Sequence, residues 1–120
     1  MYVLGIDVGS ASSKAVVFKD GAFYAGTVVQ AGTGTSGPDR VLKDILTSTG
    51  LTMNDIKRTI ATGYGRFSLD FADKQISELS CHSRGVHHLL PNARTIIDIG
   101  GQDVKTLKLD QAGRLANFVM

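Results

Sequence analysis

An aspartate, a glycine and a lysine recur with the same spacing at two places in this 120-residue chain. Asp7, Gly9 and Lys14 form the pattern D-x-G-x(4)-K, and residues 98–105 repeat it. Small residues after the aspartate would let backbone N–H groups approach phosphate oxygens, because no bulky side chain blocks the way. The carboxylate would hold Mg²⁺ or its water shell, and the lysine would place a positive charge near the phosphates. The pattern therefore predicts a phosphate-binding turn.

Each copy of the pattern supplies a set of candidate site residues. In the first copy they are Asp7, Gly9, Ser10, Ser12, Ser13 and Lys14, and in the second they are Asp98, Gly100, Gly101, Gln102, Asp103 and Lys105. Neither copy is a Walker loop, since G-x(4)-G-K-[ST] is absent. One copy alone would be better explained by an ordinary β-hairpin with a glycine turn. Because the pattern occurs twice, we expect two hairpins that face each other and bind one nucleotide from opposite sides.

Strands must position both turns, and the hydrophobic pattern predicts them. Strands are expected at residues 2–9, 14–20 and 22–31, joined by short turns into an antiparallel meander. Pro38 predicts a helix start near residue 37, and an apolar face predicts its continuation to Gly50. A strand at 58–62 precedes the glycine turn of 63–66, and helical spacing of apolar residues covers 74–90. Further strands are expected at 94–100, 104–110 and 114–120.

Composition narrows the class of protein. Hydrophobic residues make up 42% of the chain and charged residues 20%, as in an ordinary globular domain. The net charge of +2, without a run of basic residues, argues against nucleic acid as a partner. The single cysteine excludes an intrachain disulfide, and no segment resembles a signal peptide or a membrane span. We expect a cytoplasmic protein that does not associate with membranes.

The paired hairpins resemble the superfamily of actin, sugar kinases and heat-shock chaperone ATPases. More narrowly, GIDVGSASSK, GTGTSGP, ATGYGR, ADKQISELSCHSRG and IIDIGGQDVK resemble the activators of (R)-2-hydroxyacyl-CoA dehydratases and the related ATPase subunits of benzoyl-CoA reductases. This resemblance implies an α/β, actin-like (ribonuclease H-like) fold with an antiparallel meander and crossover helices. It implies a first ATPase domain at residues 1–93 and the opening hairpin of a second domain at 94–120.

The resemblance also implies a function for the complete protein. ATP or ADP would bind with Mg²⁺ held by Asp7 and Asp98, and water would attack the terminal phosphate in line. Glu78 matches the acid of the superfamily's connecting helix, which can order that water, so Glu78, Asp7 and Asp98 are the candidate catalytic residues. The family couples hydrolysis to electron transfer from its own [4Fe–4S] cluster into a dehydratase. Its electron donor is a ferredoxin or flavodoxin, and it works as a homodimer.

This chain departs from the family pattern in its cysteines. Cys81 is the only thiol, and two copies in a dimer would supply two ligands where a [4Fe–4S] cluster usually has four. Cys81 is therefore expected to be a small packed residue. The chain ends inside an expected strand, so we expect an N-terminal fragment that turns over ATP weakly or not at all. The histidines at 82, 87 and 88 are expected to be packed or solvent-facing, because 82 and 87 are not an i, i+4 pair.

Several alternatives remain open from the sequence. The chain could be a stand-alone nucleotide-binding or interaction module, or half of a kinase of the same fold. Tyr64 and Arg66 would line the nucleotide cleft, or else serve only the conformation of the glycine turn. The GTGTSGP segment would be a loop at the mouth of the cleft or a linker.

Overall fold

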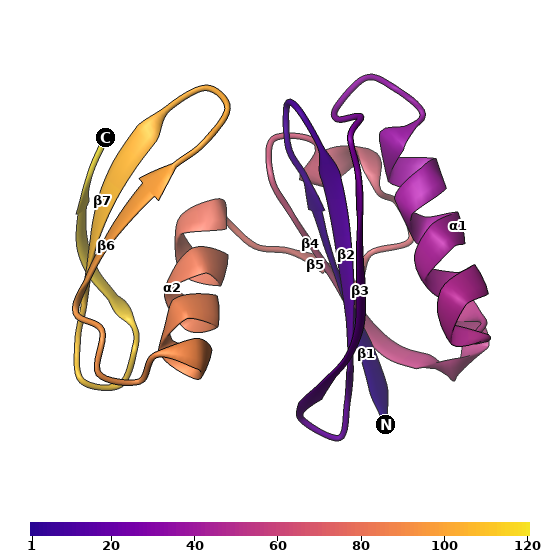
Figure 1. The fold of residues 1–120 in the computed structure, drawn as a ribbon, viewed down its shortest axis with the longest axis horizontal. Coiled ribbons are helices and arrows are strands. Elements are labelled where there is room, and N and C mark those ends of the chain that lie inside the picture. Colours follow the sequence, from indigo (N-terminus) through magenta and orange to yellow (C-terminus); the bar gives the residue numbers. More distant parts are fainter. The chain divides into compact units, whose positions relative to one another are not determined.

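The computed structural model describes all residues from 1 to 120, which form two compact units, Met1–Gln75 and Ile76–Met120. Each unit contains one β-sheet and one α-helix (Figure 1). The fold is mixed α/β, as the sequence predicts. The assignment of residues 1–93 and 94–120 to two family domains stays a prediction.

The first unit is built on a five-stranded sheet with the order β3-β2-β1-β4-β5. Its elements are β1 (Tyr2–Val8), β2 (Ser13–Lys19), β3 (Ala22–Val29), α1 (Gly37–Thr49), β4 (Ile56–Thr62) and β5 (Lys74–Gln75), with short 3₁₀ turns at Met53–Asp55 and Arg66–Ser68. The first three strands form the predicted antiparallel meander, and β4 joins the other edge of β1 in parallel. The chain crosses from β3 to β4 through α1, which makes α1 the crossover helix.

Alternating side chains bury one face of this sheet. Leu4, Ile6 and Val8 of β1 are at most 2% exposed, and Val41 and Ile45 of α1 are fully buried in the same core. Figure 1 shows α1 along one face of the sheet. The helix begins with proline in its first turn and ends at Gly50, as predicted. This packing fixes the ends of β1 and β4, where the first candidate site lies.

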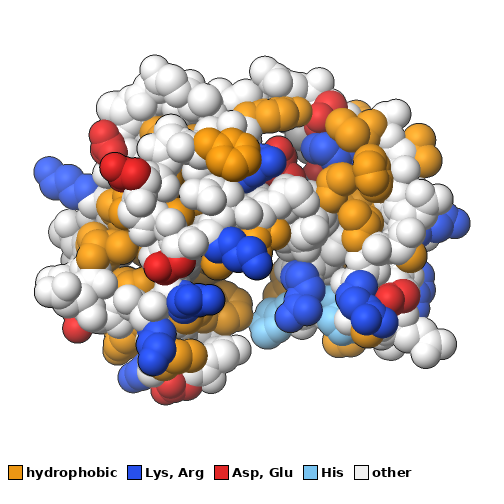
Figure 2. Space-filling model, turned by 180° about the vertical axis from the view of Figure 1, so that it is seen from behind, with side chains coloured by type: hydrophobic (Ala, Val, Ile, Leu, Met, Phe, Trp, Pro, Cys, Tyr) orange, Lys and Arg blue, Asp and Glu red, His pale blue; other side chains and the backbone are white.

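The second unit is a three-stranded antiparallel sheet with one helix. Its elements are α2 (Glu78–Leu89), β6 (Thr95–Ile99), β7 (Val104–Leu109) and β8 (Leu115–Val119), with the sheet order β6-β7-β8. Leu107 and Leu109 of β7 are buried. Ile97 and Ile99 of β6 are instead more than 60% exposed, and hydrophobic side chains gather over this unit in the right-hand part of Figure 2.

The predicted helix over residues 74–90 is wrong at its beginning. Lys74 and Gln75 form the strand β5, which pairs in parallel with β4. The helix starts only at Glu78, after Ser77, whose hydroxyl accepts a hydrogen bond from the backbone N–H of Ser80 at 3.4 Å. An N-terminal serine cap of this kind satisfies a backbone donor that the helix itself leaves unpaired. No helix in the structure has the length and apolar character required to cross a bilayer.

Candidate functional site

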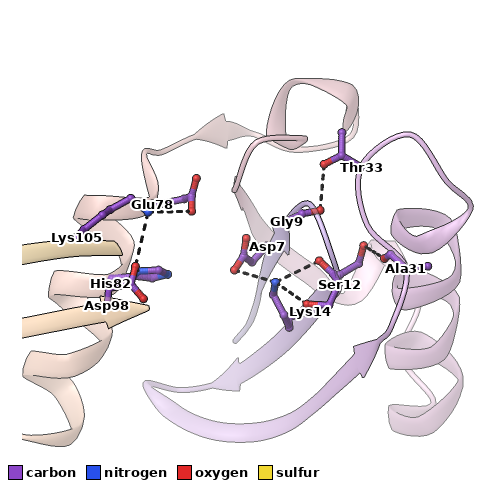
Figure 3. Close-up of polar contacts among 11 residues, drawn as sticks. Asp7, Gly9, Ser12, Lys14, Ala31, Thr33, Glu78, His82, Asp98 and Lys105 are labelled. Atoms are coloured by element: carbon purple, nitrogen blue, oxygen red, sulfur yellow. Dashed lines mark hydrogen bonds and ion pairs between the residues drawn. The ribbon is translucent and has the colours of Figure 1, made fainter. Parts of the chain in front are cut away.

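The first D-x-G-x(4)-K copy forms a tight turn between β1 and β2. Asp7 and Lys14 lie opposite each other across the two strands. The Gly9 N–H donates to the carbonyl of Ser12 at 3.0 Å, which closes the turn. The Lys14 ammonium donates to Ser12 Oγ at 3.0 Å and lies 3.4 Å from Asp7 Oδ2 (Figure 3). The turn thus holds the Asp7 carboxylate and the Lys14 ammonium side by side. Each side chain is still about one-third exposed and therefore accessible to a ligand.

The segment after β3 is bound to this turn. Both the backbone N–H and the hydroxyl of Thr33 donate to the carbonyl of Gly9, at 2.9 and 3.1 Å (Figure 3). Ser13 Oγ donates to the carbonyl of Ala31 at 2.7 Å, and Ser13 is fully buried. The GTGTSGP segment therefore packs against the turn between β1 and β2. Ser13 links this turn to the segment after β3, and its role at a phosphate stays a prediction.

The glycine turn after β4 packs against the end of β1, next to Asp7. Gly63 has a φ of +91°, and a Cβ there would lie 2.5 Å from Asp7 Oδ1. Gly32 is equally constrained, since its Cβ would lie 2.5 Å from the carbonyl oxygen of Ser10. Only glycine fits such close approaches of three backbone segments. These three loops share one end of the sheet, at the carboxyl ends of β1 and β4.

The residues of the ATGYGR turn have distinct surroundings. Arg66 donates from its guanidinium to the carbonyl of Gly63 at 2.9 Å, and so holds the turn itself. The Tyr64 side chain is 51% exposed. Thr62 lies opposite Asp7 in the sheet, and its buried hydroxyl has no hydrogen-bond partner within the protein. A buried hydroxyl without a partner is one that an ordered water or an ion could satisfy.

The second copy forms the same turn between β6 and β7. Asp98 and Lys105 lie opposite each other in register, and the Gly100 N–H donates to the carbonyl of Asp103 at 2.9 Å. Gly100, Gly101 and Gln102 are exposed at the tip of the turn. The predicted structural repeat is therefore present in the backbone of both units.

The lysine of the second copy lies among carboxylates. Lys105 Nζ is 2.8 Å from Asp103 Oδ1, 3.7 Å from Asp98 Oδ2 and 3.9 Å from Glu78 Oε2. Its side chain is only 6% exposed. The hydrogen bond that Lys105 donates to Asp103 raises the pKa of Lys105, and the charges of Glu78 and Asp98 add to this shift, although burial opposes it. The structure thus brings together Glu78, Asp98 and Asp103, three of the predicted site residues.

A histidine completes this cluster, and the sequence reasoning missed it. His82 Nδ1 lies 2.9 Å from Asp98 Oδ2 (Figure 3). His82 was expected only to be packed or solvent-facing, whereas it is half-buried against a candidate catalytic acid. One signal was available: His82 follows Glu78 by four residues, and residues at that spacing share a helix face. Cys81, its neighbour, is half-buried as a free thiol.

The sequence is similar to that of known proteins. Residues 4–120 match the BadF/BadG/BcrA/BcrD ATPase family. The activator of lactoyl-CoA dehydratase from Anaerotignum propionicum is 60% identical over the whole chain, which spans 47% of that protein.

Solved structures agree with the sequence match. The activator of 2-hydroxyisocaproyl-CoA dehydratase from Clostridium difficile, with bound ADPNP, is 56% identical with a TM-score of 0.96, over 99% of this chain and 45% of that one. Component A of the (R)-2-hydroxyglutaryl-CoA dehydratase of Acidaminococcus fermentans is 50% identical with a TM-score of 0.93, over 98% and 46%. The chain spans about half the length of these relatives.

These likenesses confirm the actin-like fold that the sequence predicts. They also confirm the resemblance to the dehydratase activators. The chain belongs to the BadF/BadG/BcrA/BcrD ATPase family.

Proposed function

We propose that this chain carries the phosphate-binding loops of an ATPase that activates a 2-hydroxyacyl-CoA dehydratase. The observation that carries the proposal is the first loop, in which three backbone segments meet around Asp7 and Lys14 with room for glycine alone. A relative that is 56% identical has been solved with bound ADPNP, an ATP analogue. The chain spans about half the length of its relatives. Dehydratase activation and its partners are therefore proposed for the whole protein.

The first loop fits the phosphates of ATP. Backbone N–H groups of residues 10–12 and the Lys14 ammonium would bind phosphate oxygens, since an anion is favoured where amides and a cation converge. Lys14 is about one-third exposed and contacts a single carboxylate, so its charge is largely available. The second loop would bind the same nucleotide, a part of the proposal that rests on the repeated sequence alone.

Mg²⁺ fits this site when it is bound together with the nucleotide phosphates. No group of three or more His, Cys, Asp or Glu residues is arranged to hold a metal ion alone. Mg²⁺ is usually bound through one or two carboxylates together with phosphates and water. Asp7 and Asp98 would supply the carboxylates, with the unpaired Thr62 hydroxyl beside Asp7. When bound, Mg²⁺ would neutralise charge on the phosphates.

Glu78 is the residue proposed to order the attacking water. It opens α2 and lies 3.9 Å from the Lys105 ammonium. This contact keeps the glutamate side chain next to Asp98 while leaving it 21% exposed. A half-buried carboxylate of this kind can orient water by accepting its hydrogen bonds.

A [4Fe–4S] cluster does not fit the residues of this chain. The chain holds one cysteine, and a cluster takes four ligands. Transfer of an electron from a ferredoxin or flavodoxin to the dehydratase, homodimer formation and a cytoplasmic location are therefore proposals for the whole protein only. The kinase alternative has no support among the relatives above, which are named as dehydratase activators.

Nucleotide binding by the chain itself tests the proposal. Backbone amide NMR spectra would be recorded during titration with ADPNP and Mg²⁺, and we expect shifts at residues 9–14 and 98–103. Asp7→Asn should weaken the Mg²⁺-dependent part of binding about tenfold or more. Asp44→Asn, an exposed acid on α1, serves as the control and should change nothing. Absence of any response at residues 9–14 with millimolar nucleotide would contradict the proposal.

A further inference from the structure

Two side chains converge on the same oxygen of Asp98. His82 Nδ1 lies 2.9 Å from Oδ2, and Lys105 Nζ lies 3.7 Å from the same atom. Both contacts are made to Oδ2. The carboxylate is therefore held at Oδ2, and its side chain is 21% exposed.

Of the two partners, only His82 is within hydrogen-bonding distance. Lys105 directs its short contact to Asp103 at 2.8 Å, and its 3.7 Å separation from Asp98 exceeds a hydrogen bond. An ammonium at that distance attracts the carboxylate without fixing its rotation. An ionised carboxylate only accepts hydrogen bonds, so the His82 Nδ1–H is the donor. The orientation of Asp98 thus depends on His82.

The helix that carries His82 is buried at the next residue. Ser83 is 1% exposed, and its hydroxyl donates within the helix to the carbonyl of Leu79 at 2.7 Å. The imidazole is 33% exposed and the Asp98 side chain 21% exposed. Their hydrogen bond is thus partly shielded from water, which strengthens it.

We propose that His82 is a positioning residue that turns the Asp98 carboxylate so that Oδ1 is presented to the Mg²⁺-bound phosphates of ATP. This inference rests on the proposed function and adds a residue to its site. Partners that orient a metal-binding side chain commonly change metal affinity about 10- to 100-fold when removed. His82 would act in this way without touching nucleotide or metal.

The first test needs no ligand. Long-range ¹H–¹⁵N spectra of the histidine side chains report which ring nitrogen carries the proton. We expect a proton on Nδ1 of His82, with an exchange rate slowed by its hydrogen bond to Asp98, and loss of that slowing in Asp98→Ala, which removes the acceptor. An unprotonated Nδ1 in the folded chain would overturn the inference.

The second test uses a graded set of substitutions. His82→Asn places an amide donor near the position of Nδ1, His82→Gln places it near Nε2, and His82→Leu removes the donor. Titration with Mg²⁺ and ADPNP should show about tenfold weaker binding for His82→Leu and His82→Gln, and a less than twofold change for His82→Asn. His88→Leu, at an exposed position on the same helix, is the matched control.

Three outcomes separate the possibilities. ADPNP binding without Mg²⁺ should be the same in all variants, which a general loss of structure would not allow. Equal Mg²⁺-dependent binding by wild type and His82→Gln would overturn the inference while leaving the proposed function intact. A wild-type chain whose amides at residues 9–14 and 98–103 ignore Mg²⁺ and ADPNP would overturn both. If His82→Leu fails to fold, the Asn and Gln variants decide the result.

Discussion

The two hairpins have the same backbone hydrogen-bonding pattern, but the surroundings of their lysines differ. Both turns close with a glycine N–H bonded to the carbonyl three residues on, and both pair the aspartate with the lysine across the strands. Lys14 is 35% exposed and contacts one carboxylate, whereas Lys105 is 6% exposed and lies near three. The same spacing therefore produces an accessible cation in one unit and a buried ion cluster in the other.

The residue two positions before the lysine contributes to this difference. Ser12 offers Lys14 a neutral hydroxyl, while Asp103 offers Lys105 a full negative charge. Helix α2 adds Glu78 and His82 to the second copy. The motif thus determines the turn, and the neighbours determine whether its lysine remains available for phosphate. In the proposed function, the first loop would therefore bind phosphate directly and the second would act mainly through its acids.

Removing each lysine should give the largest difference between the hairpins. Lys105→Met would leave Glu78, Asp98 and Asp103 to repel one another, and we expect the second unit to lose about 3 kcal/mol of unfolding free energy. Lys14→Met removes a partly exposed ion pair and should change the first unit by less than about 1 kcal/mol. Urea unfolding followed by NMR signals of each unit measures both values. Equal losses in the two units would refute the contrast.

A glycine substitution should sharpen what distinguishes the first loop. Gly63→Ala introduces a Cβ at positive φ and 2.5 Å from Asp7 Oδ1, and it should destabilise the first unit by about 2 kcal/mol. Gly100→Ala meets only ordinary contacts, the nearest at 3.5 Å, and should be nearly neutral. Thermal unfolding of both variants checks the difference. A stable Gly63→Ala chain would show that the ATGYGR turn does not constrain Asp7.

A smaller effect is expected from shortening one side chain at the same position in each copy. Ser13 occupies the position that Val104 occupies in the repeat. Ser13→Ala leaves the carbonyl of Ala31 without its 2.7 Å hydrogen bond, which should cost about 1 kcal/mol of unfolding free energy. Val104→Ala, at a side chain that is 53% exposed, should change stability by less than about 0.5 kcal/mol. Urea unfolding compares them, and no loss in Ser13→Ala would mean that the two loops are held together by other contacts.

The smallest expected effect is a pH dependence confined to the second unit. The pKa of Lys105 is raised in the folded protein, so its protonated form stabilises the fold. That contribution is fully present below the ordinary lysine pKa of 10.5 and is lost as pH rises through the higher folded value. We expect the second unit of wild type to weaken in this alkaline range. Lys105→Met should lack this dependence, and a wild-type second unit as insensitive as the variant would contradict it.

Much of this fold could be predicted from local sequence. The repeat of Asp7 and Asp98 with a lysine seven residues later was sufficient to predict both hairpins, because turn residues and strand alternation act over short distances. The helix ending at Gly50 was also predictable from its own residues. The start of α2 was not, because Lys74 and Gln75 become a strand only through pairing with β4.

The site was predictable in part, and for a similar reason. The acids and glycines of both turns could be named from spacing, but their partners come from distant segments. His82 is 16 residues from Asp98, and Thr33 is 24 residues from Gly9. Such contacts depend on how a helix or a loop packs onto the sheet, and no local pattern encodes that.

The place of each acid-bearing strand in its sheet has a further consequence. β1 lies between β2 and β4, so Asp7 stands on a strand that is paired on both sides, whereas β6 is one of the two edge strands of its sheet. Edge strands open by local unfolding at a lower free energy than central ones, because fewer backbone hydrogen bonds must break. Amide hydrogens around Asp98 should therefore exchange with solvent sooner than those around Asp7. Asp98 therefore stands on the strand that opens more easily, and its position depends more on contacts with side chains of α2.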